Sequence, residues 1–367
     1  MPSLPFLVQT ILTMLTVPVR LFAISLWYTR RANRPNPTWS FKTAFSMQII
    51  YSWFRYCTTV NWYTPKSLDP GKDGDRFIVI NPSSSTTKEV YAGTLVQDSL
   101  IQPLPIGAAW YSTTPSKPPR RLILHFHPGA YVLCGPRPSE GGGWGPSSLS
   151  ELSEWPLLSV QYRLSLDENT HFPAALQDGI TAYAYALNTL GIPPSEIVLS
   201  GESAGGNLVL AMLHYLATEN QDHSLPLPRA ALLWHPWVDM TKAATDAIDH
   251  HRLNKSDYLF SELAEWGASR YIPSNWARNH PYFSPLGNER RLSVPLFIQT
   301  GTAEVQYDEH TKYAHNMEMR GTDVELHKVS HASHAIFSCG EALGMPDAAI
   351  EGHARAARFI QKARNNL

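Results

Sequence analysis

The alternation of short apolar runs with longer amphipathic stretches constrains the fold of this chain more than any other feature. Six runs of five to seven residues lie between residues 76 and 300, in the order RFIVI, RLILHF, PLLSVQY, EIVLSG, AALLW and PLFIQT. Runs this short and apolar are typical of strands buried on both faces. Between and after them, Ala174–Leu190, Ala204–Thr218 and Asp308–Met319 have the apolar spacing of helices. The pattern predicts an α/β fold with a mostly parallel central sheet and helices on both faces.

A length of 367 residues fits one such core with additional segments better than two large domains. We expect a main domain over residues 71–367, and a hydrophobic segment with cap helices over residues 1–70. From Val238 to Pro285 a polar, aromatic and helical stretch breaks the rhythm of strands and helices. We interpret this stretch, about 238–285, as an inserted helical cap.

The N-terminal stretch from Leu4 to Tyr28 is apolar and long enough to span a bilayer. Three arginines follow it, as they do after many membrane anchors: Arg30, Arg31 and Arg34. Gln9, Pro18 and Arg20 interrupt the stretch, and an arginine near the middle of a span is costly. Two interpretations stay open. The stretch attaches the chain to a membrane, or it is an amphipathic helix that covers the mouth of a hydrophobic pocket.

The position of these arginines also bears on where the main domain lies. If the stretch spans a membrane, basic residues on its C-terminal side predict that the rest of the chain is cytoplasmic. Without a span, we also expect a cytoplasmic protein. Glycosylation at Asn254, which begins an N-x-S sequence, would reverse that orientation.

Charge and cysteine content exclude several classes of function. The 30 basic and 31 acidic residues nearly cancel and form no long run of one sign, which argues against nucleic acid as the partner. A small, weakly charged substrate fits better. Cys57, Cys134 and Cys339 are widely spaced and contain no C-x-x-C pair, so we expect free thiols rather than disulfides or a zinc site.

The sequence EIVLSGESAGGNLVLAML contains a candidate nucleophile. It places Gly201-Glu202-Ser203-Ala204-Gly205 between an expected strand and an expected helix. A G-x-S-x-G motif in that context holds the serine in a strained turn, with its hydroxyl exposed above the sheet. The alternative is an ordinary serine N-cap in a glycine turn. The context favours Ser203 as a nucleophile.

A serine needs a base to act as a nucleophile. His334, in KVSHASHAIF, follows the last strand-like stretch, where a loop at the end of the sheet brings it near Ser203. His331 is the rival, three residues earlier. The two histidines could instead bind a metal, but no carboxylate or cysteine at ligand spacing completes such a site. Other histidines are expected to have no catalytic role: His214 lies on the helix after Ser203, and His250, His251 and His353 are interpreted as solvated helix positions.

The acid that orients the base is expected between the serine and the histidine in chain order. The sequence PLFIQTGTAEVQYDEH offers Glu304, Asp308 and Glu309. Asp308 and Glu309 open the next expected helix, where negative charge is favourable for a purely structural reason. Glu304 lies in the tight stretch after the strand and is the preferred candidate, with Asp308 as the alternative.

The motifs HFHPGAY, VQYRLS, FPAALQD, GESAGG, ALLWHPWVDMT, SPL, GTAEV and SHAIF together resemble the hormone-sensitive-lipase family of α/β hydrolases, which includes arylacetamide deacetylases and steryl acetyl hydrolases. The resemblance covers roughly residues 75 to 365. It implies an α/β-hydrolase fold with a helical cap, and it implies Ser203 as nucleophile, His334 as base and Glu304 as orienting acid. Family members usually have aspartate at the last position, and glutamate also occurs. The resemblance further implies that residues 1–70 and the insert after Trp237 form the two parts of the cap, and Arg163 and Asp178 are interpreted as structural ion-pair formers.

The loop HFHPGAY departs from the family pattern. The chain has His127-Pro128-Gly129-Ala130 where the family has His-Gly-Gly-Gly or His-Gly-Gly-Ala. The resemblance implies that the amides of Gly129 and Ala130, with that of Ala204, bind the oxyanion. Pro128 has no N–H, but it replaces a glycine whose N–H is not one of the three donors. An oxyanion hole can therefore still form, although proline can change the path of the loop.

Together these residues predict a serine carboxylic-ester hydrolase that acts through an acyl-enzyme, with no metal or cofactor. The aromatic cap and the family precedent suggest a small to medium hydrophobic ester as substrate. Lactone or amide hydrolysis and acyl transfer use the same groups, so the sequence does not separate them. A non-catalytic small-molecule receptor of the same fold is the alternative of another class, and the presence of His334 argues against it.

Overall fold

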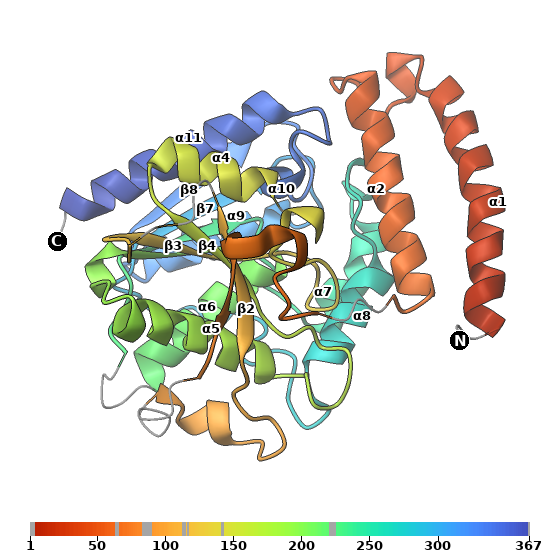
Figure 1. The fold of residues 1–367 in the computed structure, drawn as a ribbon. Helices are drawn as coiled ribbons and strands as arrows, with labels where there is room; N and C mark the ends of the chain where they lie inside the picture. Colours follow the sequence, from red (N-terminus) through yellow and green to blue (C-terminus); the bar gives the residue numbers. More distant parts are fainter. Residues whose placement is uncertain are drawn as a thin grey trace.

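The computed structural model describes residues 4–62, 66–82, 90–111, 115, 117–140, 143–219 and 225–365. Its centre is an eight-stranded sheet with the strand order β1-β2-β4-β3-β5-β6-β7-β8 (Figure 1). The strands are β1 Phe77–Ile80, β2 Ile106–Tyr111, β3 Leu122–Phe126, β4 Leu157–Gln161, β5 Ile197–Glu202, β6 Ala230–Trp234, β7 Leu296–Gly301 and β8 Val324–Val329.

Only β2 runs against its neighbours, β1 and β4, and the other adjacent strands are parallel. The prediction of a mostly parallel sheet is therefore confirmed. Strand β2 has no counterpart among the predicted runs, because its sequence IGAAWY is rich in glycine and alanine, which have little preference for strands. The expectation that RFIVI is buried on both faces is wrong. Strand β1 forms the edge of the sheet, where Val79 is 42% exposed.

Helices cover both faces of the sheet, with α4 and α11 on one face and α5 and α6 on the other (Figure 1). The helices of the described residues are α1 Leu4–Trp27, α2 Phe41–Thr59, α4 Trp144–Ser153, α5 Ala174–Ala184, α6 Ala204–Thr218, α7 Lys242–Ala247, α8 Ser261–Tyr271, α9 Tyr307–Met319, α10 Ile336–Cys339 and α11 Pro346–Asn365. The predicted helix 204–218 matches α6, and the predicted helix 308–319 matches α9 to within one residue.

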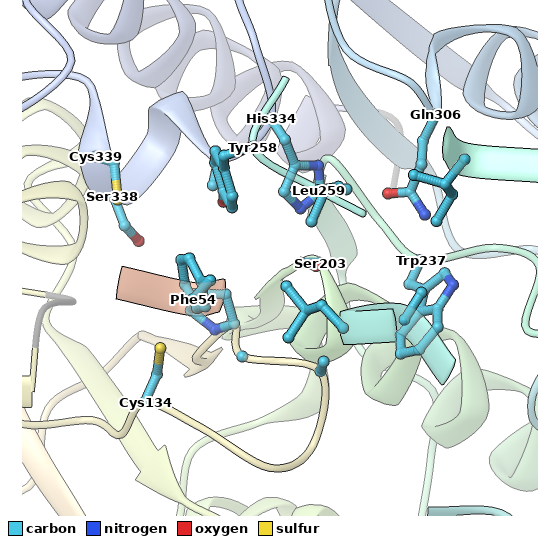
Figure 2. A pocket seen from close by; sticks show the side chains of 17 residues that line it. Phe54, Cys134, Ser203, Trp237, Tyr258, Leu259, Gln306, His334, Ser338 and Cys339 are labelled. Carbon is cyan, nitrogen blue, oxygen red and sulfur yellow. The ribbon is translucent and has the colours of Figure 1, made fainter. Parts of the chain in front are cut away.

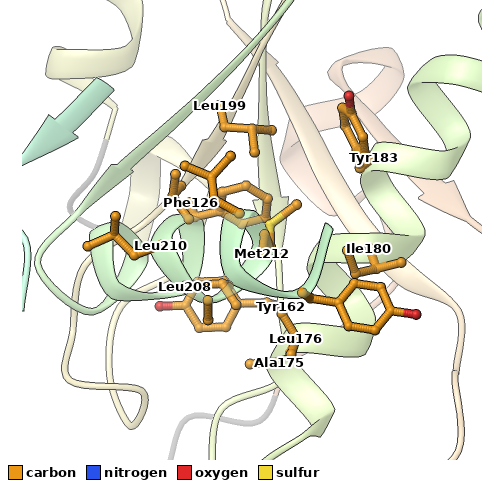
Figure 3. Packing of buried hydrophobic residues seen from close by; sticks show 14 of the residues in the cluster. Phe126, Tyr162, Ala175, Leu176, Ile180, Tyr183, Leu199, Leu208, Leu210 and Met212 are labelled. Atoms are coloured by element: carbon orange, nitrogen blue, oxygen red, sulfur yellow. The ribbon is translucent and has the colours of Figure 1, made fainter. Parts of the chain in front are cut away.

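The two-residue period of the strands divides the core into two layers. Along β5, Ile197 and Leu199 face the layer that contains α5 and α6, and Val198 faces the layer of α4 and α11. Figure 3 shows Leu199 and Phe126 of the sheet packed with Leu208 and Met212 of α6. Each such fully buried side chain contributes roughly 1.5–3 kcal/mol, so these layers fix α6 against the sheet directly behind the serine.

Two expectations about polar residues have opposite outcomes. Arg163 and Asp178 form the expected ion pair, with 2.8 Å between guanidinium nitrogen and carboxylate oxygen. The expectation that His353 is solvated is wrong, because α11 packs against both α4 and the sheet and buries the histidine completely. Its ring contacts Trp234, its Nδ1 lies 2.8 Å from Ser148 Oγ, and burial lowers its pKa to about 3.

Helices α1 and α2 form an antiparallel pair at the side of the sheet, with α1 outermost (Figure 1). Arg20 points from α1 toward α2, where it donates to Gln48 Oε1 at 2.8 Å and lies over the ring of Tyr51. Arg20 thus faces the partner helix, whereas apolar side chains such as Leu15, Val19 and Phe22 are exposed on α1. By length and composition Phe6–Trp27 could cross a membrane, and none of it is buried in the protein.

The segment between β6 and β7 contains α7 and α8 and packs against α2. Phe54 of α2 stacks on Tyr258 with 5.3 Å between ring centroids, and Cys57 of α2 belongs to a buried cluster with Phe260 and Leu263. Helix α2 therefore packs on the segment between β6 and β7.

Candidate functional site

Ser203 lies in a sharp turn between β5 and α6. Its backbone has φ 54° and ψ −114°, an unusual conformation for a residue with a side chain. The turn is held by hydrogen bonds on both sides, from Ser203 N to Trp234 O at 2.9 Å and from Trp237 N to Ser203 O at 3.0 Å. Strand β6 and the chain after it therefore stabilise the strained backbone of the serine.

The two glycines of the G-x-S-x-G motif are required by close backbone contacts. A Cβ on Gly201 would lie 2.2 Å from the carbonyl oxygen of Gly205, and one on Gly205 would lie 2.0 Å from that of Phe126. No such contact is tolerated between real atoms, so larger residues would push the turn away from β3. The motif has glycine at both positions because the backbones of β3, β5 and α6 come into contact at the end of the sheet.

The structure brings His334 and Glu304 into contact. His334 lies in the loop between β8 and α10, and its Nδ1 is 2.9 Å from Glu304 Oε2. Asp308 lies elsewhere, 57% exposed at its side chain and paired with Arg252 at 2.9 Å. His331 is also turned away from the serine, with its Nδ1 3.1 Å from the side-chain amide of Asn36. Of the candidates for acid and base, only Glu304 and His334 are hydrogen-bonded to each other.

Glu304 is completely buried, and its carboxylate is surrounded by donors. Oε1 accepts from Thr300 Oγ1 at 2.6 Å and from the amide of Gly301 at 2.7 Å, and His235 Nδ1 lies 2.9 and 3.0 Å from the two oxygens. Burial opposes ionisation, but His235 and then His310 outweigh it and hold the pKa of the carboxyl well below its usual value. Glu304 is therefore a carboxylate at neutral pH, as the partner of a protonated imidazole must be.

Ser203 and His334 line one pocket (Figure 2). Nε2 of His334 is buried and has no hydrogen-bond partner among the described residues. Because Nδ1 faces a carboxylate, it carries the proton, and Nε2 is left as an acceptor. A hydrogen bond between this nitrogen and a serine is often long or absent without substrate. The arrangement therefore presents a free basic nitrogen to the pocket of the serine.

The loop after β3 borders the same pocket through Pro128, Gly129 and Ala130. Gly129 has φ 119° and Ala130 has φ 53°, so the chain turns sharply here. The carbonyl of Gly129 accepts from Leu133 N at 2.8 Å, whereas no hydrogen bond of the described residues uses the amides of Gly129 and Ala130. Pro128 thus fits a tight loop that leaves two neighbouring amides unpaired beside the serine.

The pocket wall is mainly apolar and comes from distant parts of the chain. Phe54 comes from α2, Trp237 follows β6, Ile248 and Leu263 come from the segment between β6 and β7, and Cys339 ends α10. Its empty volume, which includes open solvent at the mouth, is about 700 Å³. Helix α1 contributes no residue to this lining.

Two buried carboxyl groups that the sequence did not single out, Asp257 and Glu202, tie the site together. Asp257 accepts from the amides of Val305 and His334, at 2.8 and 3.4 Å, and so links the loops of acid and base. Glu202 accepts from the amide and the hydroxyl of Ser338, which links the serine turn to α10. Burial raises the pKa of Asp257 to about 6 and that of Glu202 to about 8. These contacts are long-range, so no local pattern indicates them.

Among the described residues, the cysteines and the other residues of metal-binding type form no second site. Cys57, Cys134 and Cys339 are free thiols, as expected. The alternative of a metal between His331 and His334 has no support, since the two side chains have different partners. Within the described residues, the one group of three metal-ligand types is His235, Glu304 and His334, and both histidines already face the carboxylate as hydrogen-bond partners.

Comparison with known proteins places this geometry in context. Residues 123–338 match a family described as having the alpha/beta hydrolase fold. The chain is similar to an acetyl-hydrolase of Streptomyces hygroscopicus, 31% identical over 197 residues that cover 53% of this chain and 61% of that protein. It is also similar to an ethyl acetate hydrolase of Pseudomonas putida, 25% identical over 61% of this chain and 69% of that protein. The similarity to the first of these relatives thus spans less than two thirds of its length.

A solved structure shows the same fold over most of the chain. The structure of an esterase from the bacterial hormone-sensitive lipase family has a TM-score of 0.64 and covers 89% of this chain and 99% of its own, at 23% identity. The predicted α/β-hydrolase fold and the predicted family resemblance are therefore confirmed.

Proposed function

The chain belongs to the α/β hydrolase family, and we propose that it is a serine carboxylic-ester hydrolase that acts through an acyl-enzyme. The observation that carries the proposal is the bond from His334 Nδ1 to Glu304, which leaves Nε2 in the pocket of Ser203 with no partner among the described residues. A receptor that only binds its ligand needs neither a strained serine nor a free basic nitrogen beside it. A basic nitrogen beside the hydroxyl is what acyl transfer to a serine requires.

The proposed reaction has two halves. Ser203 Oγ attacks the ester carbonyl while His334 Nε2 takes the hydroxyl proton, and the imidazolium that forms is stabilised by Glu304. The same proton is then given to the leaving alcohol, which departs and leaves an acyl group on Oγ. Water attacks the acyl-enzyme in the second half, with His334 again as base, and releases the carboxylic acid.

The negative charge on the carbonyl oxygen is proposed to be bound by three backbone amides. Gly129 and Ala130 supply two of them, and both are unpaired within the described residues. Ala204 supplies the third, because it is the first residue of α6 and helix N-terminal amides have no partner within the helix. Donors fixed in this way contribute most where charge develops in the transition state.

The proposed substrate is a hydrophobic ester with a short acyl group. The pocket wall is apolar, and the two relatives are named for hydrolysing acetyl groups and ethyl acetate. We propose that α2, together with residues 238–285, forms the cap over the pocket, because Phe54, Ile248 and Leu263 line it from these segments.

Helix α1 is proposed to attach the protein to a membrane. Its 22-residue apolar window would be about 33 Å long, close to the thickness of a bilayer core. The exposed apolar side chains on it include Ile11, Leu15, Val19 and Phe22, and water is an unfavourable environment for such a surface. Esters that dissolve in lipid would then lie close to the enzyme.

The test is a series of p-nitrophenyl esters of increasing acyl length, assayed with the wild type and with Ser203→Ala. We expect turnover with acetate and butyrate, a decline for long acyl chains, and no turnover above background by the variant. Inactivity of the folded wild type toward all the esters would contradict the proposal and favour a receptor. Equal activity of Ser203→Ala would contradict the assignment of the nucleophile.

A further inference from the structure

The surroundings of Glu304 contain two histidines that the proposed mechanism does not use. His235 follows β6, His310 lies in the first turns of α9, and both are fully buried. With His334 they place three imidazoles around one carboxylate, at Nδ1–Oε distances of 2.9 Å for His235, 3.3 Å for His310 and 2.9 Å for His334. A triad acid needs only the last of these.

The hydrogen bonds of His310 determine its protonation. Nε2 lies 2.7 Å from the carbonyl oxygen of Pro236, which can only accept, so Nε2 carries a proton. Nδ1 lies 2.9 Å from Thr300 Oγ1, whose single proton is donated to Glu304 at 2.6 Å. The hydroxyl must then accept from Nδ1. Both ring nitrogens therefore carry protons, and the ring is an imidazolium.

The hydrogen bonds of His235 orient the carboxylate of Glu304. Nδ1 faces both oxygens of Glu304 and so carries a proton, whereas Nε2 lies 3.4 Å from the side-chain nitrogen of Gln299. His235 thus donates to both oxygens of the carboxylate and holds it in place.

We propose that His310 is a permanent buried cation paired with Glu304, and that it sets the basicity of His334. His235 and His310 are positioning residues: both act on the base through the carboxylate that they share with it. The negative charge of Glu304 beside His334 is then partly balanced by the positive charge of His310.

Other titratable groups also face these rings. Burial alone would lower the pKa of His310, but the Glu304 carboxylate and, more weakly, Glu309 outweigh it and raise that pKa. Asp257 faces the loop of His334, and His327 lies on the side of His235. The N-terminus of α9 disfavours a cation at His310, so the pairing depends on Glu304.

The proposal predicts the sign of a pH shift. An unbalanced carboxylate would stabilise the protonated form of His334, so removal of the His310 charge raises the pKa of the base. The acid limb of the pH profile of kcat/KM reports the pKa of this base in the free enzyme. That limb then moves to higher pH. A nearby charge typically moves a pKa by about one unit or more.

The experiment compares His310→Asn and His235→Asn with the control His353→Asn, another buried histidine, which contacts Trp234 and Ser148. The acid limb of p-nitrophenyl acetate hydrolysis should move up by about one unit in His310→Asn. It should stay in place in the control, and His235→Asn should lower kcat with little change in KM. An unchanged limb in active His310→Asn, or the same shift in the control, would overturn the proposal.

A second measurement needs no variant. Nitrogen NMR of the wild type labelled at histidine should show His310 protonated at both ring nitrogens at pH 8, and a neutral ring at pH 7 would overturn the proposal. The kinetic part rests on the proposed esterase function. If the wild type hydrolyses no ester, that function fails, while the NMR spectrum still decides the state of His310.

Discussion

The carboxylate of Glu304 determines how the residues of the site are arranged. Its side chain turns back on its own loop, so that Oε1 bonds Gly301 and Thr300 and Oε2 is left for His334. An aspartate at this position is one methylene shorter and would reach less far toward the histidine. The sequence motif alone left Asp308 as an alternative, but that residue faces Arg252 at the surface.

Substitution separates the two acids. Glu304→Gln should lower kcat by about 10⁴-fold, the loss found when a triad acid of a serine protease is neutralised. Asp308→Asn should leave kcat within a few-fold, because its exposed pair with Arg252 contributes about 1 kcal/mol or less to stability. Glu304→Asp should keep partial activity. The measurement is kcat on a short ester, together with the melting temperature of each variant.

The assignment of Glu304 depends on which variant loses turnover. A collapse of kcat in Asp308→Asn, with Glu304→Gln still active, would contradict it. Loss of activity in both variants with unchanged melting temperatures would mean that the two carboxylates act together.

Glu202 makes stability depend on pH. Burial raises the pKa of its carboxyl from 4.5 to about 8, so the folded state binds this proton more tightly than the unfolded state does. The resulting stabilisation is fully present below pH 4.5 and is lost as the pH rises through about 8. Glu202→Gln should remove this loss, because an amide cannot ionise and can still accept from Ser338.

Thermal unfolding between pH 5 and pH 9 checks this prediction. The melting temperature of the wild type should fall toward pH 9, and that of Glu202→Gln should fall less. Glu341→Gln, at an exposed position, is the control and should follow the wild type. Parallel curves for all three proteins would show that Glu202 is ionised in the folded state at neutral pH.

At the scale of elements, the turn between β5 and α6 was predictable and its surroundings were not. A strand, a G-x-S-x-G turn and an apolar helix are local in sequence, and so Ser203 could be identified from one stretch. His235, His310 and Asp257 reach Glu304 or its loop from β6, α9 and the segment between β6 and β7. Such contacts depend on how the elements pack, which no single stretch of sequence records.

Gly205 tests the packing of that turn. Gly205→Ala places a Cβ 2.0 Å from the carbonyl oxygen of Phe126, and strand β3 cannot retreat without losing its ladder. Gly287→Ala is the control, since it meets nothing within 4 Å and costs only the roughly 1–2 kcal/mol of a left-handed residue. Denaturant unfolding should show the larger loss for Gly205→Ala, along with loss of activity. An equal or smaller loss would mean that the turn is not tightly packed.

The outer face of α1 tests membrane attachment. The full-length protein should sediment with membranes, stay bound in high salt and be released by detergent. Ile11→Glu with Leu15→Glu places two charges on the exposed apolar face and should weaken that binding. Leu100→Glu, at a leucine 75% exposed outside α1, should leave it unchanged. Release of the wild type by carbonate would favour a surface helix over a span.

For the whole molecule, the order of strands and helices along the sequence was the main basis for predicting the fold. The parallel part of the sheet and the fold followed from the alternation of patterns, and the family resemblance followed from the motifs. Strand β2 gave too weak a signal, and the edge position of β1 could not be read from its apolar sequence. The burial of His353 under α11 depends on contacts between elements far apart in sequence.

The central claim is that Ser203 is the one acylated nucleophile of a serine hydrolase. The most direct test is a fluorophosphonate probe followed by mass spectrometry of the intact protein and of its peptides. We expect one probe molecule per chain, attached to the peptide that contains Ser203, with no labelling of Ser203→Ala. Absence of labelling in the folded wild type, or labelling that persists in Ser203→Ala, would contradict it.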